Sequence, residues 1–102
     1  MWQRAISGGG GGSKVVSDGF NITTAYTPQT ITVNGLTQID ELIVYNTDPQ
    51  YNVSAFMLNG NFYSNNLALV NPSANKITSI SGNQFTMQWQ AVESFTYIAV
   101  QN

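Results

Sequence analysis

The chain lacks cysteine and histidine altogether, and charged residues make up only 8% of its 102 positions. Without cysteine, neither a disulfide framework nor a thiolate zinc site can form. Without histidine, the commonest metal ligand and the usual general base at neutral pH are missing, so no Ser-His or Cys-His nucleophile can be assembled. We therefore predict a protein that is not an enzyme and that has no catalytic residues, no metal and no cofactor.

The small number of charged residues also limits the kinds of partner that the chain can bind. Three basic residues are scattered along the chain (Arg4, Lys14 and Lys76), and the formal net charge is -2. Binding to nucleic acid requires a basic patch that neutralises phosphates, and binding to anionic membranes requires a basic amphipathic surface. No apolar run approaches the length of a membrane span, and the N-terminus lacks the apolar core of a signal peptide. We expect neither nucleic acid nor a membrane as a partner.

The five carboxylates could restore an enzymatic function only if a pair of them converged in space. Asp40 and Glu41 are sequence neighbours, and neighbours on a strand point to opposite faces, so we interpret them as solvated charges at a strand entry. Asp48 precedes Pro49, which favours a turn, although a bound hard cation such as calcium stays possible there.

Hairpin signals predict the fold. Gly82-Asn83 is a two-residue turn signal, so residues 76–81 should pair with residues 84–90. The period of two then places Phe85, Met87 and Trp89 on the core face.

A second hairpin is indicated by Asn59-Gly60, which can form a type I′ turn. This turn would set Met57 opposite Phe62 and Phe56 opposite Tyr63, so that both faces of the ribbon are apolar near its turn.

Further strands are expected on either side of these hairpins. A third such dipeptide, Asn34-Gly35, separates the runs 30–33 and 36–46, and the apolar residues 42–44 suit a central strand covered on both sides. With strands near both ends of the chain, the sequence predicts an all-β fold: a small antiparallel β-sandwich, jelly-roll-like, of about eight strands. Lysines that would protect its sheet edges are scarce, so neighbours are expected to cover them.

Five consecutive glycines, residues 8–12, divide the chain. We predict an N-terminal anchoring arm with a tether over 1–13 and a sandwich domain over 14–102. The run lacks the preceding strand and following helix of a phosphate loop. It is either an engineered linker or a native tether. In the arm, Trp2, Arg4 and Ile6 are the expected partner-binding residues, because an aromatic there has no core of its own.

Aromatic side chains raise a competing hypothesis, a platform on which sugar rings stack. The pool comprises Tyr26, Tyr45, Tyr51, Tyr63, Tyr97 and Trp89. Trp89 is expected in the core, whereas Tyr26 and Tyr51 lie near turn residues and are the expected exposed glycan contacts.

Three stretches resemble small β-domains of tailed-bacteriophage and prophage virion proteins. They are QTITVNGLTQIDELIVYNT (29–47), the preceding SGGGGGS (7–13) and the closing FTYIAVQ (95–101). The resemblance implies a non-enzymatic structural protein of the virion, of the tail-fibre, baseplate or capsid-decoration type, made in the bacterial host cytoplasm. It also implies sister subunits and other virion proteins as partners, with a homo-oligomer, a trimer above all. The alternative is a stand-alone carbohydrate-binding module that recognises a bacterial surface glycan.

Overall fold

The computed structural model describes residues 13–48, 51–66 and 71–102, and these form eight β-strands and no α-helix. The strands are β1 (Lys14–Ile22), β2 (Gln29–Thr32), β3 (Glu41–Tyr45), β4 (Val53–Leu58), β5 (Asn61–Asn66), β6 (Lys76–Ser81), β7 (Gln84–Gln88) and β8 (Glu93–Gln101). The predicted all-β class is confirmed.

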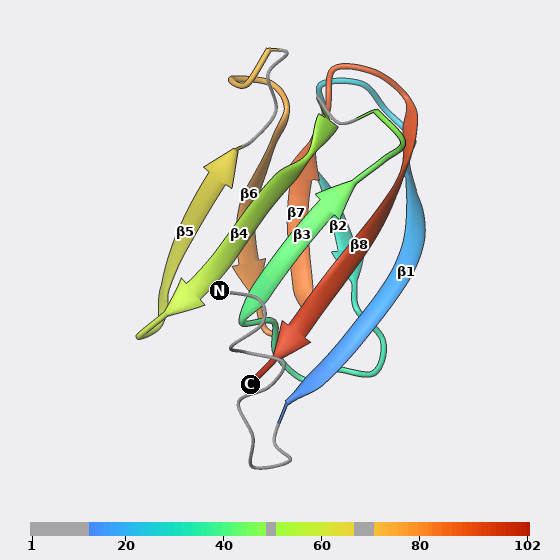
Figure 1. Ribbon diagram of the computed structural model, residues 1–102. Helices are drawn as coiled ribbons and strands as arrows, with labels where there is room; N and C mark the ends of the chain where they lie inside the picture. Colours follow the sequence, from blue (N-terminus) through green and yellow to red (C-terminus); the bar gives the residue numbers. More distant parts are fainter. Residues whose placement is uncertain (1–12, 49–50, 67–70) are drawn as a thin grey trace.

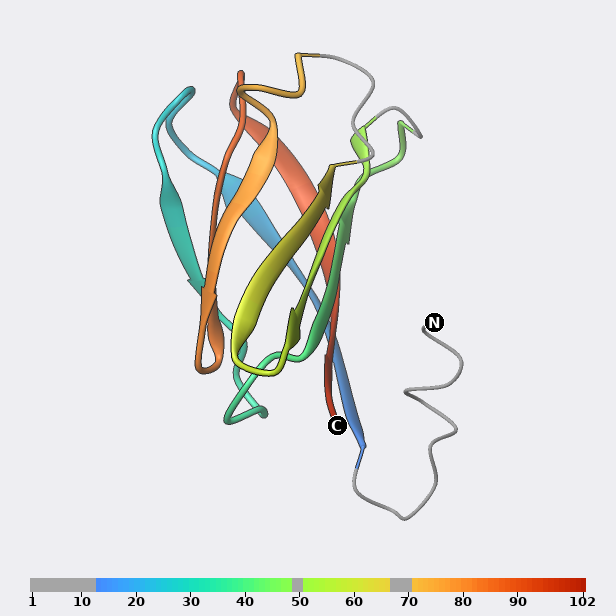
Figure 2. The ribbon, with the colours of Figure 1, turned by 90° about the vertical axis from the view of Figure 1, so that its left-hand side faces the viewer.

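The strands form two antiparallel sheets. The larger has the order β1-β8-β3-β4-β5 and the smaller has the order β2-β7-β6. Figure 1 views the sandwich with the five-stranded sheet in front, and Figure 2 turns it so that the two layers are seen from their edge. The predicted β-sandwich is therefore confirmed.

Strands from the two ends of the chain pair with each other in both sheets. β1 pairs with β8 in the larger sheet, and β2 pairs with β7 in the smaller one. This nesting is jelly-roll-like. The middle of the chain stays more local, because β4 and β5 extend the larger sheet beside β3 as consecutive hairpins.

Two of the turns have the predicted geometry. Asn59 and Gly60 both have positive φ, 53° and 79°, as a type I′ turn requires, and Met57 and Phe56 face Phe62 and Tyr63 in the predicted register.

The turn between β6 and β7 is of a second primed type. Gly82 has a φ of 57°, and Ile80 pairs with Phe85. Positive φ at the first central residue is typical of a type II′ turn. Both hairpins are thus confirmed.

The third dipeptide does not form a hairpin. Gly35 has a φ of 105°, and the Leu36 N–H donates to the Val33 carbonyl, as in a type II turn. Turns of this type splay flanking strands, because their twist does not match that of a β-ribbon. The chain accordingly passes here from β2 in one sheet to β3 in the other.

The core lies between the sheets, as the alternation predicted. Phe85, Met87 and Trp89 are all buried. Trp89 packs edge-on against Phe95 with 4.9 Å between ring centroids, and Phe85 packs edge-on against Tyr97 at 5.6 Å. These rings join β7 and the residue that follows it to β8 across the sandwich, and such pairs stabilise beyond the area they bury.

The prediction for residues 42–44 is half right. β3 is the central strand of the larger sheet, but Ile43 stays half-exposed while Leu42 and Val44 are buried. The second sheet covers only the inner face, so the outward side chain of β3 lacks a layer in the described part of the chain. The apolar run thus places an isoleucine on the outer face of the sheet.

Candidate functional site

The neighbouring carboxylates of Asp40 and Glu41 have separate surroundings. Asp40 accepts hydrogen bonds from Gln38 Nε2 at 3.0 and 3.1 Å and from the Asn102 N–H at 2.7 Å. Asp40 thereby holds the last residue of the chain. Glu41 begins β3 in the row of the sheet that faces outward, opposite Val100. The two residues do not flank a common site.

Asp48 belongs to a turn, as predicted. The Asp48 N–H donates to Asn46 Oδ1 at 2.8 Å, and the Tyr51 N–H donates to the Asp48 carbonyl at 3.0 Å. Among the residues that the structure describes, no group of three or more acidic side chains is placed to hold a metal ion. Nothing in the described geometry supports a calcium site at Asp48.

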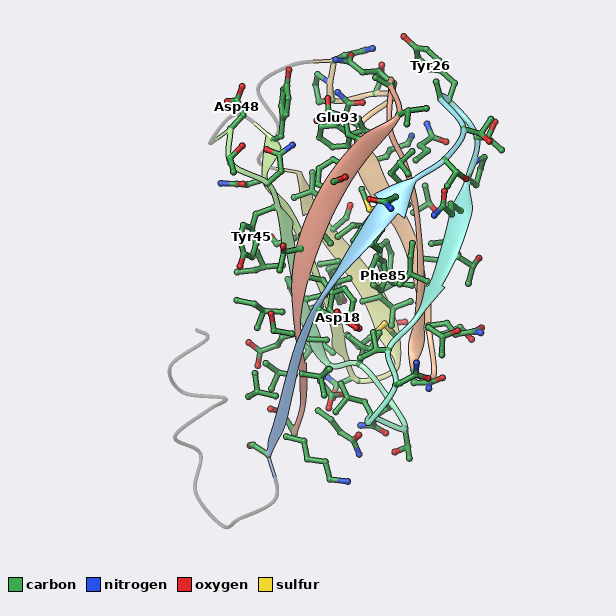
Figure 3. The ribbon with its side chains drawn as sticks, turned by 90° about the vertical axis from the view of Figure 1, so that its right-hand side faces the viewer. Asp18, Tyr26, Tyr45, Asp48, Phe85 and Glu93 are labelled. Atoms are coloured by element: carbon green, nitrogen blue, oxygen red, sulfur yellow. The ribbon has the colours of Figure 1, made fainter. Side chains whose placement is uncertain are left out.

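The two predicted glycan contacts meet the same tryptophan in different ways. The Tyr26 N–H donates to the Trp89 carbonyl at 2.7 Å, and the Tyr26 side chain is 62% exposed at one end of the sandwich (Figure 3). Tyr51 is instead half-buried, because its ring packs edge-on against Trp89 at 5.5 Å. The prediction of an exposed Tyr51 is wrong, since its position beside a turn also places it over an aromatic core.

A hollow at one end of the larger sheet brings together polar residues that the sequence analysis did not single out. It has a volume of about 420 Å³ and lies where β3 ends and β8 begins. Its lining residues are Tyr45, Asn46, Thr47, Glu93, Ser94, Phe95 and Thr96. Asn46 Nδ2 donates to Glu93 Oε2 at 3.0 Å, and Tyr45 points away from the sandwich (Figure 3). The hollow is thus lined by a tyrosine, a carboxylate, an amide and hydroxyl groups.

The signal for this hollow was weak in the sequence. Tyr45 was one aromatic of a larger pool, and it lies opposite Thr96 only because β3 pairs with β8. The local sequence of either segment does not predict which distant strand it pairs with.

The outer face of the five-stranded sheet carries most of the exposed large apolar side chains of the described residues. Six such side chains are exposed by at least 39%, and four of these belong to β1, β4 and β5 of this sheet: Val15, Phe56, Leu58 and Tyr63. Single exposed apolar residues are ordinary, whereas a contiguous group marks an interaction surface.

The register aligns these residues across the sheet. One line of directly paired residues crosses all five strands: Val15, Val100, Glu41, Phe56 and Tyr63. We call this line the outer row. Val100 is fully buried although it lies outside the core cluster, and Leu58 lies two residues beyond Phe56 on the same face of β4. Glu41 is the one acidic residue of the outer row.

The predicted arm residues Trp2, Arg4 and Ile6 lie outside the described residues. The described chain begins at Ser13, and β1 starts one residue later at the edge of the larger sheet. The arm therefore connects to the sheet two residues before Val15, at one end of the outer row.

In the described part of the chain, no helix is long and apolar enough to cross a membrane. Comparison of the chain with protein-family models, with curated proteins and with solved structures finds no match.

Proposed function

We propose that this protein is a non-enzymatic structural component of a bacteriophage virion, attached through its N-terminal arm and displaying the β-sandwich. The sequence resemblance to tail-fibre, baseplate and decoration domains supports the proposal. The observation that carries it is the outer row, whose exposed apolar side chains lie toward the two edges of the sheet, with Val15 at the edge where the arm enters. Exposed apolar surface of this kind is typical of permanent protein–protein interfaces.

The proposed partners are other virion proteins and sister subunits, in a homo-oligomer and above all a trimer. Only 8% of the residues are charged, so contacts made by this chain depend mainly on apolar area and on amide and hydroxyl groups. Assembly should then respond weakly to ionic strength, because salt screens charge and leaves apolar burial intact.

The arm is tested by deletion. A tagged chain lacking residues 1–12 is supplied during infection, and purified particles are assayed for the tag alongside the full-length chain and a Gln3→Ala control. We expect the deletion to lose incorporation and the control to retain it, because Gln3 is neither apolar nor charged. Equal incorporation of the deleted chain would show that the arm is not the anchor.

A second function is favoured by the hollow at Tyr45, namely binding of a bacterial surface glycan. A sugar ring offers one apolar face and a rim of hydroxyls, which match the tyrosine ring and the carboxylate, amide and hydroxyl groups that line the hollow. The exposed ring of Tyr26 lies at the end of the sandwich and is the other candidate contact.

A glycan array separates these contacts. If Tyr45→Ala abolishes glycan binding and Tyr63→Ala does not, the hollow is the glycan site. If Tyr26→Ala abolishes binding, the glycan site is at the end of the sandwich. Tyr63 is a suitable control because it lies on the same sheet, is exposed and does not line the hollow. If the chain binds no glycan on the array, the carbohydrate-binding function is rejected.

A further inference from the structure

The outer row has an aromatic pair at one end that a partner can cover. Phe56 and Tyr63 stack with 5.2 Å between ring centroids and an interplanar angle of 18°, and they remain 39% and 44% exposed. Leu58, 55% exposed, extends the same surface. At the other end of the row Val15 is 48% exposed. The row thus offers two apolar contacts separated by Glu41.

We propose that residues 1–7 of the same chain dock along the outer row in the free subunit, with Ile6 on Val15, Arg4 at Glu41 and Trp2 on the Phe56–Tyr63 pair. The inference concerns the single chain in dilute solution and does not depend on the virion function proposed above.

The spacing of the arm residues matches that of the row. In an extended segment alternate side chains share one side, so Trp2, Arg4 and Ile6 point together, with about 13 Å between the first and the last. Val15 and Phe56 are three strands apart, which is about 14 Å. Arg4 lies midway between Trp2 and Ile6, and Glu41 lies between the two apolar ends of the row.

The segment can reach this surface. Eight residues lie between Ile6 and Val15, and this segment spans up to about 30 Å when extended, which is ample for a chain that turns back over its own sheet. Five of those residues are glycines, which tolerate the positive φ that a tight reversal needs. The glycine run thereby has a structural use beyond that of a passive spacer.

Charge favours the same orientation. Arg4 is the one basic side chain of residues 1–12, and Glu41 is the one acidic residue of the outer row. A guanidinium beside a carboxylate gains charge-assisted hydrogen bonds, which fix the register of an otherwise apolar contact.

Docking within one chain is favoured over exchange with a second copy at low protein concentration. A short flexible tether holds its ends at an effective concentration in the millimolar range. A neighbouring copy competes only when its own concentration approaches that value.

The absence of cysteine provides a direct test. Two cysteines are introduced in Gln3→Cys/Asn61→Cys, where Asn61 is exposed on β5 and pairs with Leu58. The control is Gln3→Cys/Ser79→Cys, where Ser79 is exposed on β6 of the other sheet. Because Gln3 lies on the opposite side of the segment from Trp2, the two thiols are bridged with a flexible bismaleimide and not by direct oxidation. Cross-linking is followed by peptide mass spectrometry at low micromolar concentration, and far-UV circular dichroism verifies the fold.

We expect the intramolecular cross-link to form at least tenfold faster in the Asn61→Cys chain than in the control. Adding Trp2→Ala or Glu41→Gln should lower that rate. Equal rates in the two chains, or a rate that Trp2→Ala leaves unchanged, would overturn the proposal. Cross-linked dimers in place of a cross-linked monomer would also overturn it, because a second copy would then cover the row.

Discussion

Tyr97 lies directly opposite Asp18 where β8 pairs with β1, so that a buried phenol faces a carboxylate. Burial raises the pKa of Tyr97 above its ordinary value, and the charge of Asp18 raises the pKa further. Both effects disfavour the phenolate in the folded state. The unfolded chain therefore releases this proton at lower pH than the folded chain does.

The first prediction is a loss of stability in alkali. Below the unfolded pKa of about 10 both states hold the proton, and above it only the folded state does, so the free energy of unfolding falls as pH rises. Urea unfolding from about pH 9 to about pH 11 measures this slope. Tyr97→Phe should flatten it, and Asp18→Asn should reduce it by a smaller amount. An unchanged slope in Tyr97→Phe would contradict the prediction.

The second prediction compares three glycines. Gly60 has a φ of 79° and open space where a Cβ would lie, so Gly60→Ala should cost about 1 kcal/mol of unfolding free energy from backbone strain alone. Gly35→Ala should cost more, because its φ is 105° and its Cβ would lie 3.3 Å from Val16 Cγ2.

Gly19 is the matched control for both. Its Cβ would meet the Phe95 carbonyl at an ordinary 3.5 Å, and its φ lies outside the left-handed region. Gly19→Ala should change the unfolding free energy by no more than about 0.5 kcal/mol. Denaturant midpoints at constant slope measure all three variants. Equal losses in the three chains would contradict this ranking.

The third prediction concerns Asn75, a fully buried polar residue. Its Oδ1 accepts the Gln90 N–H at 2.8 Å, so Asn75→Ala removes the partner of a part-buried backbone donor. We expect a loss of about 1–3 kcal/mol in the free energy of unfolding. Ser73→Ala, at an exposed position in the same turn, should have little effect. A similar small effect of both substitutions in thermal melts would refute the role of Asn75.

The fourth prediction contrasts two phenylalanines. Phe85 is 1% exposed and packs against Phe20 and Tyr97, so Phe85→Ala should cost about 3–5 kcal/mol of unfolding free energy. Phe56 is 39% exposed on the outer row, and Phe56→Ala should cost about 1 kcal/mol. Denaturant unfolding of both variants measures the contrast. Comparable losses of stability from the two substitutions would show that Phe56 belongs to the core.

Local signals predicted the hairpins because a turn depends on only a few residues. Asn59-Gly60 and Gly82-Asn83 both form primed turns with the expected pairing. Asn34-Gly35 has the same kind of dipeptide and forms a different turn, because here the chain leaves one sheet for the other. The dipeptide permits positive φ, and the packing of the neighbouring strands decides which turn is made.

The candidate surfaces were less predictable. Phe56 and Met57 are adjacent, and the alternation alone does not tell which of them faces the core, because both faces of that ribbon are apolar. The hollow at Tyr45 likewise depends on the distant Glu93, which the pairing of β3 with β8 brings close.

Local sequence was enough to specify the strands, two of the turns and the Phe85–Met87–Trp89 core stripe, because these follow from a period of two and from the backbone freedom of glycine and asparagine. The alignment of Val15, Val100, Glu41, Phe56 and Tyr63 in one row exists only in the folded chain. These residues come from five strands, and their alignment depends on the register of long-range pairs. One face of the larger sheet is covered by the second layer, and the other carries the exposed side chains of Val15, Phe56 and Tyr63.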